Sequence, residues 1–326
     1  MLKLRDVGEL GFLKLISKYV NDLGFLKFGD DASDLRVDGK SIVVTVDSLS
    51  EGSDKLPGMS YQQFGWKCAV YSLSDLAAKG AKPLALLLSL SAPSSLEVGD
   101  AESIVKGFSS ACQSFNSLYI GGDLGEAPEV VVTSVGLGVA EHSIIPRSGA
   151  RPGDLVAVTG YFGWTGLAFK ILLEGFPVKD EQLKRLALRS AYTPKPRVNL
   201  GIALAKSGVA SASIDSSDGL AKSLHELSRM SGVGFEITEL PAPPRLKRYA
   251  EEHGLELFDL VLYGGEEFEL VVTVRQGMWP QACRVAKAAG GRLLRIGKVV
   301  EENKVYYRSK EEERVIPPLG WSHFER

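Results

Sequence analysis

The sequence predicts a protein of the α/β (or α+β) class, with mixed sheets and flanking helices, built from two domains. Apolar, β-branched runs alternate with helix-like patterns along all 326 residues, which is typical of sheets covered by helices. This length is sufficient for two hydrophobic cores of ordinary size. The stretch "PRSGARPGD" at 146–154 is rich in proline, glycine and charge and has no hydrophobic periodicity. We therefore expect one domain at 1–146 and a second at 147–326.

The first domain begins with apolar residues at helical spacing within 5–21, before "NDLGF" breaks the pattern. "SIVVTVDS" at 41–48 is β-branched and ends in a polar tip, which predicts a buried strand. "SYQQFGWKCAVYSLSDLAAKG" at 60–80 predicts a helix that ends at Gly80, with Pro83 just beyond it. The same patterns predict a helix at 97–116 and strands at 83–93 and 129–141, and "LYIGGDLG" at 118–125 predicts a short strand followed by a tight turn.

The second domain continues the alternation with shorter runs. "LVAVTG" predicts a strand, and "WTGLAFKILLEG" predicts the helix after it. Residues 181–208 have a helical pattern that prolines interrupt, and residues 210–237 predict strand, turn, helix and strand. The remaining predictions are a turn leading into a strand at 259–274, a helix near 278–289, and strands at 293–300 and 304–308.

Composition and charge exclude several classes of protein. The chain is 44% hydrophobic and 24% charged with a net charge of −2, so it has no overall basic field that would attract nucleic acid. It lacks the run of about 18 apolar residues that a membrane-spanning helix needs, and its charged N-terminus is unlike a signal peptide. Cys68, Cys112 and Cys283 are far apart and form no zinc or redox motif. We expect a cytoplasmic protein that binds neither nucleic acid nor membranes.

The common phosphate-binding loops are absent from the sequence. No G-x-x-x-x-G-K-[ST] motif occurs, so the chain has no lysine-bearing loop of the P-loop type. "GYFGWTG" at 160–166 lies between a predicted strand and a predicted helix, but it does not match G-x-G-x-x-G. A single glycine-rich turn of this kind usually serves only as a tight connection.

Acidic residues in turns and at strand ends give the strongest functional signal. Asp30 and Asp31 are adjacent in "KFGDDAS", although neither helix nor strand interiors favour such a pair. Two unit charges about 4 Å apart repel by about 4 kcal/mol at an effective dielectric constant of about 20. A Mg²⁺ ion would offset this repulsion, because it takes oxygen ligands and bridges carboxylates to phosphates. The full set is Asp30, Asp31, Asp47, Asp75, Asp123, Asp215 and Asp218, with Glu266 and Glu267 in "YGGEEFEL".

Each aspartate taken alone has a simpler interpretation. Asp75 and Asp218 each precede a helical pattern or lie within one, where a carboxylate can act as an N-cap or form an Asx-turn. For any single aspartate this structural role is favoured. For the whole set, on so many separate turns, a shared metal site is the better explanation.

Seven short motifs resemble, in order and separation, those of the thiamine-monophosphate kinase family, which belongs to the aminoimidazole-ribonucleotide-synthetase-like superfamily. They are "GDDAS", "TVDSLSEG", "SLSDLAAKGAKP", "IGGDLG", "RSGARPGD", "IDSSDGL" and "GGEEFEL". The resemblance runs from about residue 9 to the terminal "GWSHF". One motif would be a weak signal, whereas seven in order over nearly the whole chain are specific.

The resemblance implies the two-domain architecture of that superfamily and a kinase that uses ATP and several Mg²⁺ ions. Such a kinase phosphorylates thiamine monophosphate directly to thiamine diphosphate, with no residue acting as a covalent nucleophile. By position, the resemblance assigns Mg²⁺ binding to Asp30, Asp31, Thr45, Asp47, Asp75, Asp123, Asp215 and Asp218. It assigns ATP contacts to Gly122, Asp123, Arg147 and Ser217, and acceptor contacts to Asp54, Glu266 and Trp321. It also implies a homodimer, in which first-domain strands of two chains join in a barrel.

The chain departs from the family pattern at four positions, and two other functions stay open. Val46 and Leu124 stand where the family often has threonine, Asp54 replaces a common histidine, and Glu267 replaces a usual aspartate. No central carboxylate is lost. One alternative is a superfamily relative that uses ATP on another acceptor. The other is a protein that binds nucleotide or thiamine phosphate without catalysis, against which the intact carboxylates argue. Trp321 has a competing interpretation as a core aromatic.

Overall fold

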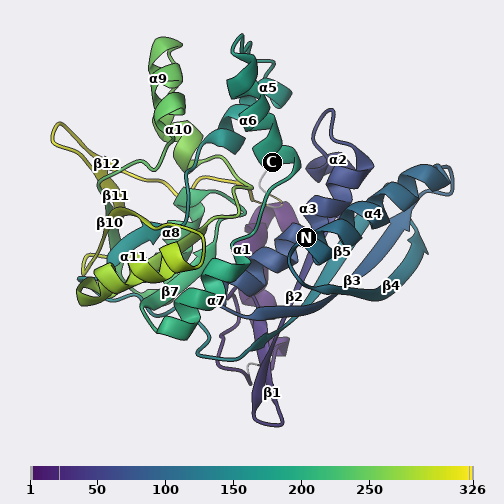
Figure 1. Cartoon of the computed structure of the whole chain (residues 1–326), viewed down its shortest axis with the longest axis horizontal. Coiled ribbons are helices and arrows are strands. Elements are labelled where there is room, and N and C mark those ends of the chain that lie inside the picture. The colour runs from purple at the N-terminus through teal and green to yellow at the C-terminus, as the bar shows by residue number, and fades with distance from the viewer. Residues whose placement is uncertain (1–2, 22, 323, 325–326) are drawn as a thin grey trace.

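The computed structural model describes residues 3–21, 23–322 and 324. It contains two mixed β-sheets that lie side by side, each with helices packed against it (Figure 1). The five-stranded sheet has the order β1-β2-β5-β3-β4, and the seven-stranded sheet has the order β12-β11-β8-β10-β6-β9-β7. The predicted class and the predicted mixed sheets are confirmed.

The first sheet is built from the first half of the chain. Its strands are β1 (Ser33–Val37), β2 (Lys40–Ser50), β3 (Lys82–Ala92), β4 (Leu118–Glu126) and β5 (Val131–Ala140). Two helices, α3 (Tyr61–Ala78) and α4 (Val98–Ser114), pack on each other and on this sheet. A capping box starts α3, because Ser60 and Gln63 exchange hydrogen bonds between side chain and main chain. Most of α3 is buried. It contacts strands of the first sheet as well as α7 (Val198–Ser207) and β7 (Ala210–Asp215) of the second half, so its side chains reach both halves of the molecule.

One face of the first sheet is turned away from these helices. Thr45 of β2 is buried, whereas the next residue, Val46, is 65% exposed. Successive side chains of a strand point to opposite faces. Val46 therefore shares the outer face with Val135 of β5, its partner in register, and with Leu87 of β3, which pairs with Val135. An apolar row that crosses three strands remains partly exposed.

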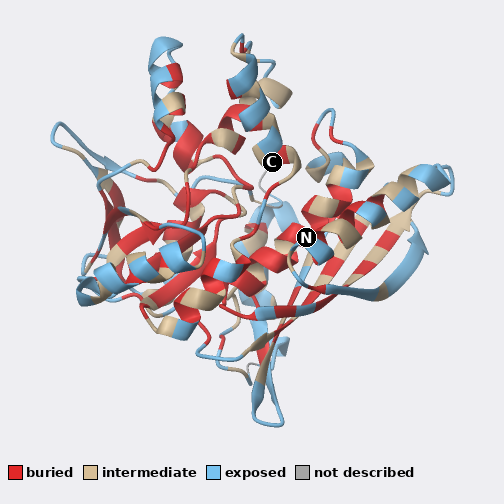
Figure 2. Ribbon diagram, viewed as in Figure 1, coloured by how far each residue is buried: buried red, intermediate tan, exposed pale blue. Residues whose placement is uncertain are grey.

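The strands of the second sheet are more fully buried than those of the first sheet. Its strands are β6 (Leu155–Val158), β7 (Ala210–Asp215), β8 (Gly234–Ile237), β9 (Leu270–Val274), β10 (Leu294–Val300), β11 (Val305–Arg308) and β12 (Glu313–Val315). All residues of β8 and β9 are buried. Figure 2 shows buried residues concentrated in this sheet and along the helices between the two halves.

The other helices surround the two sheets. They are α1 (Leu4–Ile16), α2 (Glu51–Asp54), α5 (Trp164–Leu173), α6 (Glu181–Tyr192), α7 (Val198–Ser207), α8 (Leu220–Ser231), α9 (Pro244–Glu252), α10 (Leu257–Leu262) and α11 (Trp279–Ala288), with 3₁₀ turns at Ser17–Tyr19 and Gln276–Met278. Within the described ranges, no helix has the length and apolarity needed to cross a membrane.

The structure corrects four of the predicted elements. The tight turn expected within 118–125 is instead part of β4, which runs from Leu118 to Glu126. The helix expected at 5–21 has a non-helical residue at Gly8, with φ 64°, and its α-helical part ends at Ile16. β1 was not predicted, because "SDLRV" is mostly polar and exposed and shows no clean alternation. The turn expected from 259 onward begins within α10, whose six residues are too few to show a helical period.

Candidate active site

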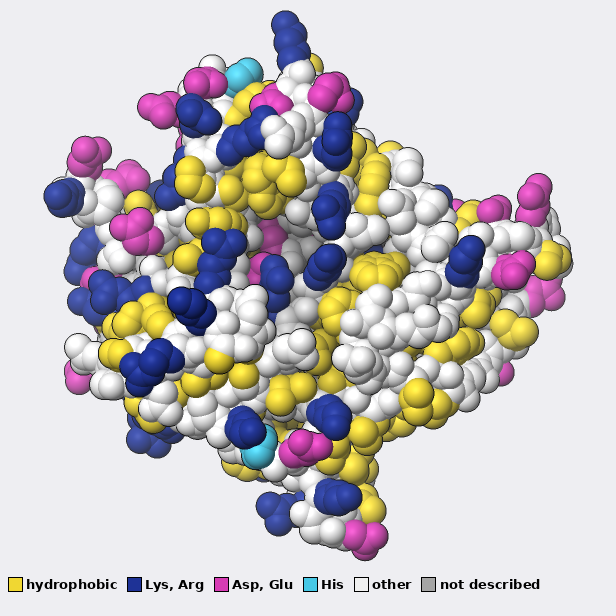
Figure 3. All heavy atoms as spheres, in the orientation of Figure 1, with side chains coloured by type: hydrophobic (Ala, Val, Ile, Leu, Met, Phe, Trp, Pro, Cys, Tyr) yellow, Lys and Arg dark blue, Asp and Glu magenta, His cyan; other side chains and the backbone are white. Residues whose placement is uncertain are grey.

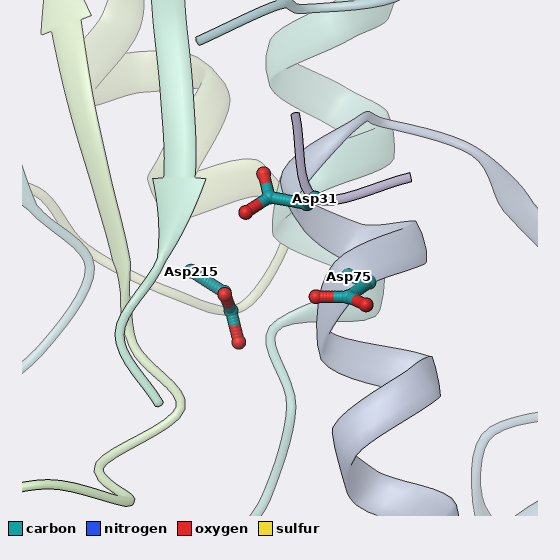
Figure 4. Close-up of side chains that lie close together, drawn as sticks. All are labelled: Asp31, Asp75 and Asp215. Carbon is teal, nitrogen blue, oxygen red and sulfur yellow. The ribbon is translucent and has the colours of Figure 1, made fainter. Parts of the chain in front are cut away.

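Three aspartates from distant parts of the chain meet between the two sheets. Asp31 precedes β1, Asp75 lies in α3, and Asp215 ends β7. Each offers one carboxylate oxygen, and these three atoms lie within 4.8 Å of one another. Figure 4 shows the side chains grouped in the space between the end of the strand and the helix. The structure therefore brings together part of the predicted metal set, from both halves of the chain.

Hydroxyl groups orient two of these carboxylates. The Oγ1 of Thr45 donates a hydrogen bond to the Oδ2 of Asp75. The Oγ of Ser74 donates to the Oδ2 of Asp215 over 2.8 Å. The first bond ties α3 to the first sheet and the second ties it to the second sheet, so α3 fixes the position of one carboxylate relative to the other.

Among the described residues, no lysine or arginine forms an ion pair with Asp75 or Asp215, although the charge of Arg147 is felt at Asp215. Burial, together with the charges of Asp47, Asp215 and Asp31, raises the pKa of Asp75 well above its usual value. Burial and the charge of Asp31 raise the pKa of Asp215 to about 8. Burial, followed by Asp31, also raises the pKa of Asp47 to about 6, although the Oγ of Ser72 donates to it over 2.8 Å. Ionisation of all three carboxylates requires a cation.

Asp30 and Asp31 have counterions supplied by the protein itself. The Nζ of Lys79 lies 2.6 Å from Asp30 Oδ1 and 2.6 Å from Asp31 Oδ2, and it donates to the Ser213 carbonyl over 2.9 Å. Arg147 donates from Nε to Asp31 Oδ1 over 2.8 Å and from its main-chain N to Asp30 Oδ2 over 2.9 Å. Burial alone would raise the pKa of Asp31, but Arg147 and Lys79 hold it below its usual value.

Sequence reasoning missed two cations, Lys79 and Lys67. Both are fully buried, whereas a lysine in a helix is normally exposed. The signal that could have found Lys79 is its neighbourhood, "LAAKGA", in which every other residue is small or apolar. Lys67 likewise stands in the apolar run "GWKCAV".

Two predicted acceptor contacts, Asp54 and Glu266, are joined through one of these lysines. The Nζ of Lys67 donates to the main-chain carbonyl of Asp54 over 2.7 Å and to the Oε1 of Glu266. The carboxylate of Asp54 itself accepts from the main-chain N of Ser50 over 2.8 Å and from Ser53 Oγ over 2.6 Å. The side chain of Asp54 therefore makes hydrogen bonds within the short helix α2 and at its N-terminus, while the main-chain carbonyl of Asp54 accepts from Lys67.

Asp218, Ser217 and Trp321 lie together on the second domain. The main-chain N of Trp321 donates to the carbonyl of Asp218 over 3.1 Å. The Nζ of Lys222 lies 2.8 Å from Asp218 Oδ2 and 2.5 Å from the carbonyl of Trp321. The carbonyl of Ser217 accepts from the N of Glu266 over 2.6 Å. Trp321 is 38% exposed, which does not fit a core aromatic.

Asp123 and Gly122 are not brought to the carboxylate cluster. Both belong to β4, the edge strand of the first sheet, where Asp123 is exposed and Gly122 is also accessible. A Cβ at position 122 would lie 1.7 Å from the carbonyl oxygen of Leu88, so only glycine allows this close approach of the two strands. The roles assigned to Asp123 and Gly122 stay predictions.

Three of the four departures from the family pattern, Val46, Leu124 and Glu267, are not members of the cluster. Val46 and Leu124 are exposed, at 65% and 79%, and Val46 points to the face of β2 opposite Thr45. The Oε1 of Glu267 accepts from the N of Gly163 over 3.1 Å, and burial raises the pKa of Glu267 to about 8. The hydrogen bond to Glu267 therefore stabilises the glycine-rich turn at 160–166. This supports the interpretation of the turn as a structural connection.

The surface between the two halves is hollowed. On the face drawn in Figure 3, acidic side chains lie inside the hollow, and lysine and arginine side chains surround it. This charge arrangement suits a polyanionic ligand that is bound through cations.

Comparisons with known proteins agree with this geometry. Residues 29–140 match the family "AIR synthase related protein, N-terminal domain", and residues 151–310 match "AIR synthase related protein, C-terminal domain". The two matches lie on either side of the predicted division at residues 146 and 147, which stays a prediction.

Two curated relatives illustrate the similarity in sequence. A thiamine-monophosphate kinase from Nitrosopumilus maritimus is 32% identical over 285 residues, which are 87% of this chain and 90% of the relative. A thiamine-monophosphate kinase from Aquifex aeolicus is 30% identical over 326 residues, which are 99% of this chain and 100% of the relative. The similarity extends through both domains.

Solved structures extend the similarity to the fold. The structure of AaThiL complexed with AMPPCP and TMP has a TM-score of 0.86 and 28% identity, over 99% of each chain. The structure of a protein from Thermus thermophilus has a TM-score of 0.86 and 35% identity, over 94% of this chain and 98% of that chain. The chain belongs to the thiamine-monophosphate kinase family of AIR synthase related proteins.

Proposed function

We propose that this protein transfers the γ-phosphoryl group of ATP to the phosphate of thiamine monophosphate, giving thiamine diphosphate and ADP. The observation that carries the proposal is the cluster of Asp31, Asp75 and Asp215, assembled from both halves of the chain. The relatives named thiamine-monophosphate kinase and the AaThiL complex with AMPPCP and TMP indicate the two substrates.

Phosphoryl transfer requires the protein to align the two substrates and to neutralise the negative charge of their phosphates. The acceptor is already an ionised phosphate, so the reaction needs neither a covalent nucleophile nor a strong base. Both substrates carry several negative charges, and bare carboxylates would repel them. Lys79 and Arg147 balance Asp30 and Asp31, but no cation of the described residues contacts Asp75 or Asp215 within salt-bridge distance.

The donor set fits Mg²⁺. Carboxylate oxygens are hard ligands of the kind that Mg²⁺ binds. Burial and the neighbouring carboxylates raise the pKa values of Asp75 and Asp215, so a cation is needed to favour their ionised forms. Asp31, Asp75 and Asp215 would hold the ion, with Asp47 beside them. A bound Mg²⁺ would supply positive charge that offsets the negative charge of the substrate phosphates. Mg²⁺ binding by Asp30, Thr45, Asp123 and Asp218 stays a prediction. ATP binding by Arg147 and Ser217 also stays a prediction.

Identification of the product tests this function. The protein is incubated with ATP, Mg²⁺ and, in separate reactions, thiamine, thiamine monophosphate and a panel of other phosphorylated small molecules, and each product is identified by mass. We expect thiamine diphosphate from thiamine monophosphate and no product from thiamine, which lacks the acceptor phosphate. Phosphorylation of a different acceptor would favour a superfamily relative with another substrate, and no product from any acceptor would favour a binding protein.

A homodimer is part of the proposal. The outer face of the first sheet carries the apolar row Val46, Val135 and Leu87, and the edge strand β4 adds Leu118 and Ile120, which are 66% and 55% exposed. A contiguous apolar face of this kind marks an interaction surface. A second copy of the chain would cover it by joining its own first sheet.

Substitution on this face should weaken the dimer. We expect the wild-type protein to sediment as a dimer at micromolar concentration, and Val46→Lys to shift it toward the monomer, because a charge would be buried in the interface. Val98→Lys is the matched control: Val98 is 83% exposed at the start of α4. The oligomeric state of all three proteins is measured by sedimentation velocity. A wild-type protein that is monomeric and fully active would contradict the proposed dimer.

The proposed location is the cytoplasm, where ATP is available. Cys68, Cys112 and Cys283 are free thiols, and the first two are buried. Unpaired cysteines are typical of proteins in a reducing compartment.

A further inference from the structure

One oxygen of Glu266 is held by two side chains of α3. The Nζ of Lys67 donates to Glu266 Oε1, and the side chain of Lys67 has no exposed surface. The hydroxyl of Tyr71, about one helical turn further along, donates to the same Oε1 over 3.1 Å. Burial, followed by the charge of Glu266, raises the pKa of Tyr71 well above its usual value, so the hydroxyl keeps its proton and remains a donor.

The second oxygen of Glu266 is unsatisfied. Oε2 is buried and accepts no hydrogen bond from any residue that the structure describes. Buried polar atoms are nearly always hydrogen-bonded, and leaving one without a partner destabilises the fold. The two oxygens of one carboxylate therefore differ: the protein supplies two donors to the first and none to the second.

The main chain around Glu266 has an unusual conformation that hydrogen bonds hold in place. Glu266 and Phe268 adopt positive φ values of 63° and 51°, which are unfavourable for residues other than glycine. Main-chain hydrogen bonds hold both residues, from the N of Glu266 to Ser217 and from the N of Phe268 to Ser216 over 3.0 Å. The ring of Phe268 packs edge-on against Tyr71, with 4.8 Å between centroids.

We propose that Lys67 and Tyr71 are positioning residues for the acceptor: they hold Glu266 so that its Oε2 accepts a hydrogen bond from the pyrimidine amino group of thiamine monophosphate. The inference rests on the proposed function. The amino group is the one N–H donor of that molecule, whose phosphate oxygens and pyrimidine nitrogens offer lone pairs. Because Lys67 already balances the charge of Glu266, Oε2 suits an uncharged amine better than the cationic thiazolium.

The same lysine couples the two halves of the acceptor site. Lys67 also binds the carbonyl of Asp54 at the end of α2, while Glu266 belongs to the second domain. One buried ammonium group thus sets the distance between a first-domain turn and the residue that selects the amine. Loss of this group should affect acceptor selection more than nucleotide binding.

The test measures selection of the amine by binding and by kinetics. Thiamine monophosphate is compared with oxythiamine monophosphate, in which an oxo group replaces the amine, for the wild type, Tyr71→Phe, Lys67→Met and Lys67→Arg. Dissociation constants come from calorimetry, and kcat and KM come from turnover. Tyr306→Phe is the matched control, because the buried Tyr306 donates to a glutamate, Glu236 Oε2, over 2.7 Å within the second sheet.

We expect the wild type to bind the amine compound more tightly than the oxo compound. Tyr71→Phe should reduce this preference about tenfold, through the Kd and KM of the acceptor, while the KM of ATP stays unchanged. Lys67→Met should reduce the preference further, and Lys67→Arg should restore part of it. Tyr306→Phe should keep the wild-type preference whatever it does to stability.

Two results would overturn the inference. If Tyr71→Phe keeps the same preference as Tyr306→Phe, the contacts to Glu266 are only structural, and this holds even if Lys67→Met does not fold. If the wild type binds both compounds equally well, Oε2 does not accept from the amine. Failure of the proposed function gives a different pattern, in which the wild type binds neither compound.

Discussion

Asp215→Asn should lower kcat by about 10²–10³-fold and, without metal, raise the melting temperature. The amide can still accept the hydrogen bond from Ser74 Oγ, so the local shape is kept. The substitution removes a carboxylate whose pKa burial raises to about 8. Ionisation of such a group destabilises the fold by about 1.4 kcal/mol for each pH unit by which its pKa is raised. The same negative charge that destabilises the metal-free protein is the one that would hold the cation.

The measurements are kcat with both substrates saturating and the melting temperature in EDTA. Asp154→Asn is the control, because Asp154 is also buried and its Oδ2 accepts from a serine, Ser211, over 2.5 Å. We expect the control to keep its turnover. A folded Asp215→Asn protein with nearly normal kcat would exclude Asp215 from the reaction.

Stabilisation by Mg²⁺ should increase as the pH rises. The folded-state pKa values of Asp75, Asp215 and Asp47 are raised, to about 8 for Asp215 and about 6 for Asp47. At these three carboxylates the folded protein binds more protons than the unfolded chain, so their contribution to metal-free stability falls from about pH 4 to about pH 8. Mg²⁺ binds the ionised carboxylates, so its stabilising effect should be small near about pH 5 and large near about pH 8.

The difference in melting temperature with and without Mg²⁺, measured across this range, isolates the cluster. The pKa of Glu267 is also raised, to about 8, but Glu267 contacts the turn at Gly163 and its contribution cancels in the difference. Asp215→Asn should flatten the pH dependence of the Mg²⁺ effect. An effect of Mg²⁺ that is equal at low and high pH would contradict the prediction.

The fold was predictable where the hydrophobic pattern is long and regular. The helix predicted at 60–80 is α3 (Tyr61–Ala78), because its apolar positions run over several turns and Gly80 ends the pattern. α10 has only six residues, and in β1, an edge strand paired with β2, Asp34 is buried while Leu35 and Val37 are exposed. Their formation depends on tertiary contacts that local sequence does not encode.

The acidic residues of the site could be predicted from the sequence, but the buried lysine that neutralises two of them could not. Asp31, Asp75 and Asp215 converge, as expected for aspartates in turns and beside apolar segments. No motif indicated that Lys79 would lie 2.6 Å from both Asp30 and Asp31. Burial of a lysine depends on which helix face meets the second domain, and this is decided by packing.

The most direct test of the central claim is the electron paramagnetic resonance spectrum of Mn²⁺ bound to the wild-type protein. Thiamine monophosphate is supplied with and without a magnetic oxygen isotope in its phosphate, with AMPPCP present. If the carboxylate cluster holds a cation that contacts the acceptor phosphate, the isotope should broaden the lines of bound Mn²⁺. Bound Mn²⁺ whose lines do not change with the isotope, or a spectrum that Asp215→Asn leaves the same, would contradict the account.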